Sequence, residues 1–170
     1  MLVHVFPRIN QKHRGIVRIG NLTLPCALGR SGIITQKREG DGATPRGKLR
    51  AVAVYFRLDR LPLRHFGLPA KPITKHDGWC DDPRYRRYNR PVQLPSSWSH
   101  EALWRDDHLY DIIIETSWNR RPAVRGRGSA IFIHLARPGF LPTEGCIALD
   151  RKGIQLLLSH LTINTHIRIH

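Results

Sequence analysis

The sequence predicts a mainly β fold, a sandwich or barrel-like domain with one substantial C-terminal helix. Short runs that alternate apolar and polar residues, or that are wholly apolar, recur along the chain between glycine- and proline-containing turns. Helical spacing of apolar residues appears clearly only after Asp150. The chain has 170 residues and no internal repeat, and this length can bury one core, so we expect a single domain over residues 1–170.

The first strands form a predicted meander. Leu2–Phe6 alternates in the manner of a strand, and we expect Pro7 to end it because proline cannot donate a hydrogen bond to a sheet. Gly15–Ile19 and Leu22–Ala27 flank Gly20-Asn21, a residue pair that closes two-residue hairpin turns. These runs therefore predict a hairpin.

The middle of the chain is less regular. Residues 29–47 are rich in glycine and charge and predict a long ordered loop. Lys48–Arg57 alternates as a strand, and its predicted inward face is Leu49, Ala51, Ala53 and Tyr55. Asp59–Asp77 has no clean period and predicts loop and short turns, while Ser99 is a candidate cap for a short helix through Trp104.

The last third supplies the clearest elements. Leu109–Thr116 predicts a buried strand, and Ile131–Leu135 and Ile147–Leu149 predict two more, joined by a Pro/Gly-rich loop. Asp150 is a predicted N-cap for a helix from Arg151 to about Leu161. Its apolar face consists of Ile154, Leu157, Leu158 and Leu161, and a last strand, Thr162–Ile169, is expected to turn Ile163, Ile167 and Ile169 partly inward.

Composition restricts the partners and the location. The net charge is +15, which favours a polyanionic partner, but the arginines are scattered and no helix-turn-helix, zinc-finger or RNA-recognition pattern occurs, so we expect no specific nucleic acid. No run approaches the roughly 20 apolar residues of a transmembrane segment. Residues 1–14 lack the apolar core and cleavage site of a signal peptide.

Three cysteines are an odd number, which argues against a disulfide framework. Cys26 lies in an apolar run and is predicted to be core. Cys80, beside Trp79, is predicted to line a cleft, and the sequence does not exclude a disulfide at this residue. Cys146 is predicted to be a free thiol.

Cys146 and His134 are the candidate catalytic pair, since each lies at the end of a predicted strand. An imidazole within reach of a thiol can take its proton and activate it as a nucleophile. Gly145 permits a backbone turn that lets the amides of Gly145 and Cys146 face an oxyanion. The alternative is a packed cysteine with a structural histidine. A metal site is not expected, because no second Cys or His lies at ligand spacing.

These residues also carry a resemblance to a known family. A strand-borne His134 followed by Thr143-Glu144-Gly145-Cys146-Ile147 resembles the catalytic signature of the L,D-transpeptidase (YkuD-like) family, whose members cross-link bacterial peptidoglycan through a cysteine. Thr44-Pro45-Arg46-Gly47 resembles the family's T-P-x-G segment. Gly78–Pro83 with Tyr88-Asn89 resembles a G-W-C-D-D-P…Y-N segment of one branch, in which the cysteine motif reads T-E-G-C-I-A-L.

The chain departs from the family at three points. His134 is followed by Leu135 where many relatives have glycine, the loop from His134 to Thr143 is short, and Ala148 stands where many relatives carry Arg or Asn. Arg137, inside the loop, is the candidate for the missing positive charge, because a guanidinium can hold a carboxylate in a bidentate fork.

The resemblance implies a fold, a reaction and a location. It implies an L,D-transpeptidase-like β-sandwich or barrel that needs no cofactor, acts on stem peptides containing meso-diaminopimelate and works in the periplasm or cell envelope of a bacterium. The implied product is a cross-link made through a cysteine thioester, with the branch pointing to the 1,3 type between L-alanine and meso-diaminopimelate. The resemblance places Trp79, Asp81, Tyr88 and Asn89 at the substrate cleft, and Arg137, Thr143 and Glu144 are further candidates for substrate binding. Glu144, next to the thiol, is expected to oppose thiolate formation and is therefore assigned an orienting or substrate-amine role.

Other functions stay open at this point. The same site can make 3,3-type cross-links, or act as an L,D-carboxypeptidase when water resolves the thioester. A basic anion- or nucleic-acid-binding β domain with an inert cysteine is the alternative from another class, and the sequence indicates no oligomeric state.

Overall fold

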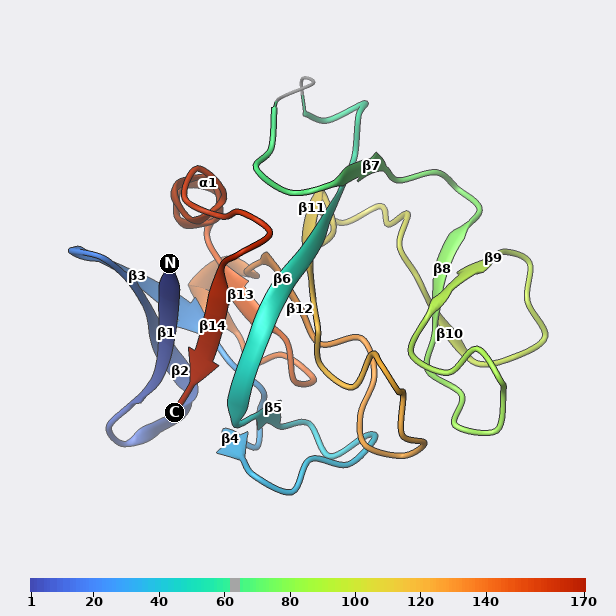
Figure 1. Cartoon of the computed structure of the whole chain (residues 1–170), viewed down its shortest axis with the longest axis horizontal. Coiled ribbons are helices and arrows are strands. Elements are labelled where there is room, and N and C mark those ends of the chain that lie inside the picture. Colours follow the sequence, from blue (N-terminus) through green and yellow to red (C-terminus); the bar gives the residue numbers. More distant parts are fainter. Residues whose placement is uncertain (62–64) are drawn as a thin grey trace.

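The computed structural model of the chain describes residues 1–61 and 65–170. Its strands lie largely where the sequence predicts them, and the β-rich fold class with one substantial helix is confirmed. The strands are β1 (Leu2–Arg8), β2 (Gln11–Ile19), β3 (Leu22–Ala27), β4 (Ile33–Ile34), β5 (Thr44–Pro45), β6 (Gly47–Phe56), β7 (Ala70–Pro72), β8 (Asp77–Cys80), β9 (Pro91–Gln93), β10 (His100–Ala102), β11 (Ile112–Thr116), β12 (Phe132–Leu135), β13 (Ile147–Leu149) and β14 (His166–Ile169). A 3-10 turn, η1 (Pro138–Phe140), and the helix α1 (Arg151–Leu158) complete the fold (Figure 1).

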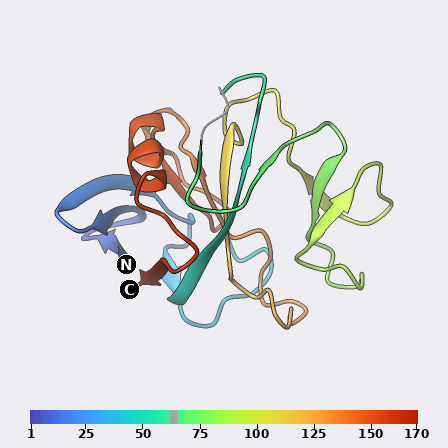
Figure 2. The same ribbon diagram turned by 45° about the horizontal axis from the view of Figure 1, so that its top comes forward.

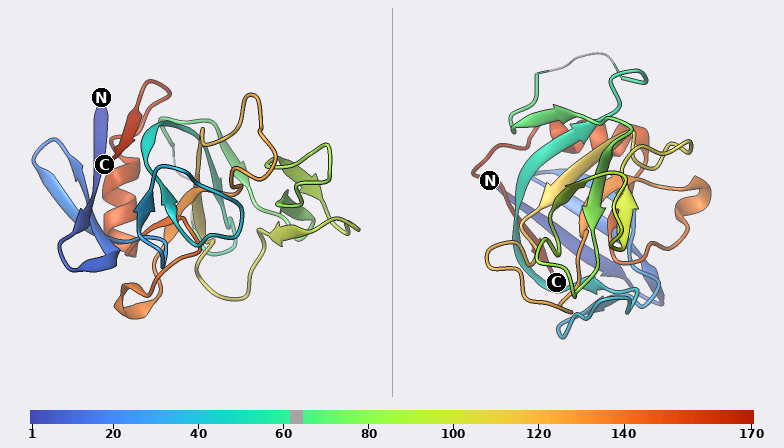
Figure 3. Two further views of the ribbon diagram at one scale, coloured as in Figure 1. Left: turned by 90° about the horizontal axis from the view of Figure 1, so that it is seen from below. Right: turned by 90° about the vertical axis from the view of Figure 1, so that its right-hand side faces the viewer.

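Nine strands form one sheet in the order β11-β12-β13-β3-β2-β1-β14-β6-β7, and an additional pairing of β11 with β6 closes it into a barrel-like sheet. The first and last strands lie side by side because β1 pairs with β14 in parallel, and the N- and C-termini therefore lie at opposite ends of this pair (Figure 1). A separate three-stranded sheet, β10-β8-β9, stands at the other end of the molecule (Figure 3). The shorter β4 and β5 pair within the loop that the sequence predicts for residues 29–47.

The helix α1 lies at one end of the closed sheet, between the N-terminal strands and β6 (Figures 2 and 3). Asp150 caps it by accepting a hydrogen bond from the Gly153 N–H, as its position in the sequence predicts. The buried side chains of Ile154, Leu157 and Leu158 join the main core, so the helix closes this core against water.

A second core lies on the other face of β11 and β12. Its members are Ile73, Trp79, Leu103, Tyr110, Ile113, Phe132 and Cys146. Successive side chains of a strand point to opposite faces of the sheet, so β12 sends Ile133 and Leu135 into the main core and Phe132 and His134 to the second face. This alternation brings His134 to the region between the closed sheet and the three-stranded sheet.

Four local predictions are wrong. β1 continues through Pro7, because the irregularity of its pairing with β2 comes after that residue. Residues after Ser99 form the strand β10 instead of a helix, since they pair with β8. Asp59–Asp77 contains the strand β7 and the start of β8, and its residues 62–64 lie outside the described chain. Ile163 is 63% exposed, although Ile167 and Ile169 are buried as expected.

The predicted inward face of β6 is also partly wrong. The pairing with β11 shifts register between Glu115 and Thr116, leaving Val52 without an opposite residue. Such a bulge reverses the side-chain alternation. Leu49 and Ala51 therefore face the main core as expected, Val54 takes the inward place predicted for Ala53, and Tyr55 packs against the second core.

Candidate active site

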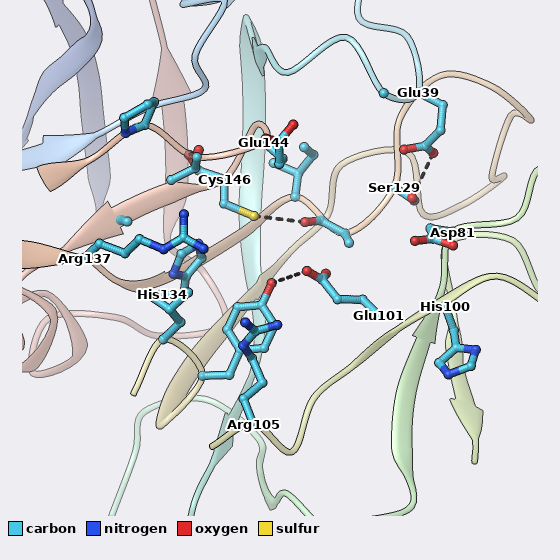
Figure 4. Close-up of a pocket in the computed structure, with 18 of the residues that line it drawn as sticks. Glu39, Asp81, His100, Glu101, Arg105, Ser129, His134, Arg137, Glu144 and Cys146 are labelled. Carbon is cyan, nitrogen blue, oxygen red and sulfur yellow. Dashed lines mark hydrogen bonds between the residues drawn. The ribbon is translucent and has the colours of Figure 1, made fainter. Parts of the chain in front are cut away.

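A cavity of about 440 Å³ opens between the second face of β12–β13 and the loop and strand around β10. Cys146 and His134 both line it, as do Arg137, Thr143 and Glu144 from the loop between their strands. Figure 4 shows Cys146 with His134 and Arg137 on one side and the carboxylates of Glu101 and Asp81 on the other. Glu101 lies 45 positions before Cys146 in the chain and Asp81 still earlier, yet both come close to the same thiol.

Cys146 lies immediately before β13 and is only 9% exposed. Its S–H donates to the Ala130 carbonyl at 3.1 Å, and its sulfur accepts from the Phe132 N–H at 3.4 Å. Burial raises the pKa of the thiol to about 12, and the nearby charge of Glu101 acts in the same direction. The free protein therefore holds a protonated thiol.

His134 lies in β12, where it pairs with Ile113. Its Nδ1 lies 2.8 Å from the Leu135 carbonyl oxygen, which can only accept, so Nδ1 carries the proton and Nε2 keeps a lone pair. Burial lowers the pKa of the imidazole to about 4, while the hydrogen bond to Leu135 acts against this and the charges of Arg105 and Arg137 reinforce it. His134 is therefore a neutral ring whose orientation comes from a backbone carbonyl.

The parallel pairing of β12 with β13 brings the two groups together. His134 lies opposite Ala148, two residues after Cys146. Side chains two residues apart on a strand share a face, so Cys146, Ala148 and His134 point to the same cavity. In this state the thiol hydrogen bonds to Ala130 instead of His134, and the S–H must leave that carbonyl before the imidazole can take its proton.

Gly145 adopts a φ of +138°, and a Cβ there would lie 2.7 Å from the Ala43 carbonyl oxygen. The turn before the cysteine thus requires glycine. Its N–H donates to Thr143 Oγ1 at 3.2 Å, and the Thr143 hydroxyl donates to the Cys146 carbonyl at 2.6 Å. The expectation that two amides face an oxyanion is therefore wrong for Gly145. The Cys146 N–H, which makes no hydrogen bond to the described residues, is the remaining donor.

Replacing Gly145 with alanine should lower the free energy of unfolding by about 2–4 kcal/mol, because it adds a backbone clash to an unfavourable φ. Urea unfolding followed by circular dichroism measures this. Gly126→Ala is the matched control: its φ is +76° but a Cβ there meets nothing within 4 Å, so only the strain of about 1 kcal/mol remains. Equal losses in the two variants would contradict the clash.

The acid that acts on the thiol is Glu101 and not Glu144, contrary to the prediction. Glu144 is exposed and forms an ion pair with Arg30. Glu101, from β10, accepts a hydrogen bond from the Tyr110 hydroxyl at 2.6 Å, and burial raises its own pKa. The Tyr110 ring in turn meets the His134 ring edge to face at 5.2 Å between centroids. No sequence pattern links Glu101 to the cysteine, because only the pairing of β10 with β8 brings it to the cavity.

Three of the residues assigned to substrate binding lie behind the cavity instead. Trp79, Tyr88 and Asn89 are buried and do not line the cavity. The Asn89 side-chain oxygen accepts from the Trp79 indole N–H at 2.9 Å and from the Ala130 N–H at 3.1 Å. Asn89 therefore positions the residue whose carbonyl receives the Cys146 thiol.

The remaining branch-motif residues divide between the cavity and its support. The Tyr88 hydroxyl donates to Glu39, which lines the cavity together with Asp81. Cys80 is fully buried, free of any disulfide, and directed toward the Asp82 carbonyl. Its predicted place in the cleft is therefore wrong. Cys26 is buried in the main core as expected.

The cavity is lined by both positively and negatively charged side chains. Arg137 lines the cavity. Arg105, which follows β10 in the chain, lines it as well and was not predicted from the sequence. Glu39, Asp81 and Glu101 supply the carboxylates. The buried Oδ1 of Asp81 accepts no hydrogen bond from the described residues. Such a cavity suits a ligand that has both an ammonium and a carboxylate group.

Within residues 1–61 and 65–170, no cluster of three or more His, Cys, Asp or Glu side chains is arranged to hold a metal ion. No helix in this part of the chain has the length and apolar character needed to cross a membrane.

Comparison with known proteins identifies one family model that matches, described as the L,D-transpeptidase catalytic domain (YkuD), over residues 8–169. No curated protein matches the chain. Solved structures that are similar include an L,D-transpeptidase from Mycobacterium tuberculosis H37Rv, with 12% identity over 99% of this chain and 57% of that one and a TM-score of 0.45.

Two more solved structures have the same degree of similarity. L,D-transpeptidase 3 from Mycobacterium tuberculosis is 12% identical over 99% of this chain and 60% of its own, with a TM-score of 0.47. An L,D-transpeptidase from Mycobacterium smegmatis is 14% identical over 99% and 58%, with a TM-score of 0.45. The chain therefore spans 57% to 60% of the length of these structures.

Proposed function

Because the chain belongs to the YkuD family of L,D-transpeptidase catalytic domains, we propose that it is a cysteine-dependent acyltransferase that cross-links peptidoglycan stem peptides. The observation that carries this proposal is the placement of Cys146 and His134. Parallel strands direct both side chains to one cavity, and His134 Nδ1 is committed to the Leu135 carbonyl, which leaves Nε2 as the base.

The acylation step starts from a neutral thiol and a neutral imidazole. As the Cys146 sulfur attacks the carbonyl carbon of an L-to-D peptide bond, His134 Nε2 takes the thiol proton. The oxygen of the tetrahedral intermediate accepts from the Cys146 N–H. The C–N bond then breaks, His134 returns the proton to the departing amine of the D-residue, and a thioester remains on Cys146.

The second step reverses these roles. An amine of another stem attacks the thioester carbonyl, His134 takes one proton from it, and the sulfur leaves to recover that proton. The product is a new peptide bond and free enzyme. Each step uses only substrate atoms and side chains of this chain, so we propose that no cofactor takes part.

The charges of the cavity support a stem containing meso-diaminopimelate as substrate. The D-centre of this residue carries an ammonium and a carboxylate group when free. Arg137 and Arg105 can bind the carboxylate, and Asp81, whose Oδ1 has no hydrogen-bond partner among the described residues, can accept hydrogen bonds from the ammonium. We place the reaction in the bacterial cell envelope, where such stems occur.

The branch motif favours a 1,3-type cross-link between L-alanine and meso-diaminopimelate. In that case the L-alanine carbonyl forms the thioester and the D-residue after it leaves. In a 3,3-type enzyme the acyl group is the L-centre carbonyl of diaminopimelate instead. Both bonds run from an L- to a D-centre, so the same cysteine and histidine serve either reaction.

Incubating the purified protein with defined muropeptides and analysing the products by tandem mass spectrometry tests the proposal. We expect dimers in which L-alanine is joined to diaminopimelate. Dimers with unlinked L-alanine would overturn the 1,3 assignment and retain a transpeptidase. Products that are only hydrolysed at an L-to-D bond would identify an L,D-carboxypeptidase. The absence of a reaction with any stem would contradict the proposal that the protein is an enzyme.

A further inference from the structure

The face of the sheet turned away from the main core carries a row of basic residues across four neighbouring strands. The pairing registers place Arg18 of β2 beside His4 of β1, His4 beside Arg168 of β14, and Arg168 beside Lys48 of β6. The adjacent residues Val3, Val5, Val17 and Ile167 point into the core, so the four members of the row point to solvent. We call this surface, with Arg50 and His166 beside it, the cationic face.

No acidic residue balances these charges. β1, β2, β3, β6 and β14 contain no Asp or Glu, and the first acidic residue of the chain is Glu39. The acids gather instead around the candidate active site and the three-stranded sheet. Four of the 28 Lys and Arg residues, Arg18, Lys48, Arg50 and Arg168, therefore lie on strands without an acidic residue, on a surface that the proposed reaction does not use.

Aromatic rings beside the row are already stacked on one another. Phe6 stacks on His170 with ring centroids 4.3 Å apart, His4 lies 5.7 Å from Phe6, and the Arg18 guanidinium stands 5.3 Å over the Phe6 ring. Proteins that bind single-stranded nucleic acids offer open aromatic faces to the bases. Phe6 has neither face open, which argues against a nucleic acid here.

Exposed apolar side chains border the cationic face. Ile9, in the turn between β1 and β2, is 90% exposed and is flanked by Arg8 and Lys12, while Leu2 at the start of β1 is 41% exposed. Val52 is exposed at the bulge in β6. Cations next to exposed apolar side chains fit the headgroup region of a bilayer, where phosphates lie above acyl chains.

From these observations we infer that the cationic face docks the protein on an anionic phospholipid membrane, with Ile9 entering the headgroup region. The row of Arg18, His4, Arg168 and Lys48 faces the lipid phosphates. The catalytic cavity is built from other strands and stays free of the membrane. Docking would keep the proposed enzyme next to its substrate layer, and it does not depend on the catalytic assignment.

Cosedimentation of the protein with vesicles tests the inference. We expect binding to phosphatidylcholine vesicles that contain phosphatidylglycerol, little binding to pure phosphatidylcholine, and weaker binding as salt is raised. The Arg18→Glu/Arg168→Glu variant should bind at least about tenfold more weakly, because each cation near an anionic surface contributes a factor of about five. Ile9→Ser should bind several-fold more weakly.

Arg86→Glu/Arg127→Glu is the matched control, since it changes net charge equally through exposed arginines outside the cationic face. It should bind nearly as well as wild type, and equal losses in the two double variants would overturn the site. Failure to bind anionic vesicles would overturn the inference that the cationic face binds a membrane. Tighter binding to duplex DNA through the same arginines would identify a nucleic acid as the partner instead. Cys146→Ala should bind like wild type, which separates docking from catalysis.

Discussion

Replacing Cys146 with alanine is expected to abolish cross-linking of defined muropeptides, by about a thousandfold or more. The reason is that the acyl group of the proposed reaction passes from one stem to the other through a thioester on this sulfur. The substitution removes one atom and two weak hydrogen bonds, those with Ala130 and Phe132. The protein should therefore stay folded, with a nearly unchanged thermal unfolding midpoint.

Product formation measured by liquid chromatography, together with mass spectrometry of a carbapenem adduct, provides two readouts. The wild type should gain the mass of the adduct on Cys146, and the variant should gain none. Cys80→Ala is the matched control, because Cys80 is also a buried free thiol but does not line the cavity. Activity that survives in Cys146→Ala, or is lost equally in Cys80→Ala, would refute the assignment of the nucleophile.

Replacing His134 with alanine is expected to lower the rate of acylation by about 10²–10⁴, the usual contribution of a general base. The pH profile distinguishes this role from a structural one. In the wild type the pKa of His134 is lowered to about 4, so the ring is neutral above that pH. The rate should be nearly flat between pH 5 and 8 and fall only as His134 becomes protonated near pH 4.

The rate of the His134→Ala variant should depend on pH in a different way, because the variant must rely on spontaneous ionisation of a thiol whose pKa is raised to about 12. Its rate should rise about tenfold per pH unit through the neutral range. His76→Ala, which removes an exposed histidine outside the cavity, is expected to keep the flat profile. A wild-type rate that increases through pH 6.5, or a flat profile in His134→Ala, would contradict a neutral imidazole acting as the base.

The same lowered pKa affects stability. In the unfolded chain a histidine titrates near 6.5, whereas folded His134 titrates near 4. Between these values the unfolded state binds the proton and the folded state does not, so burial of His134 makes the free energy of unfolding fall as the pH is lowered through this window. The burial that keeps His134 neutral thus also lowers the free energy of unfolding at acidic pH.

Local patterns were sufficient for the strands that alternate cleanly and for the helix. The hairpin at Gly20-Asn21 and the Asp150 cap depend on neighbouring residues, so the sequence carries their signal. The inward face of β6 could not be predicted in full, because the bulge at Val52 arises in its pairing with the distant strand β11. The strand β10 was missed for the same reason, since three residues acquire strand structure only by pairing with β8.

The sequence by itself determined the family, the β-rich fold class and the candidate thiol and imidazole, because these follow from short motifs and from periodicity. Only the tertiary structure decided what surrounds the thiol. It placed Glu101 and Arg105 at the cavity, moved Trp79, Tyr88 and Asn89 behind it, and bound the Gly145 amide to Thr143. It also assembled the cationic face from cross-strand neighbours. Burial and strand pairing join residues far apart in the chain, and no local pattern records those contacts.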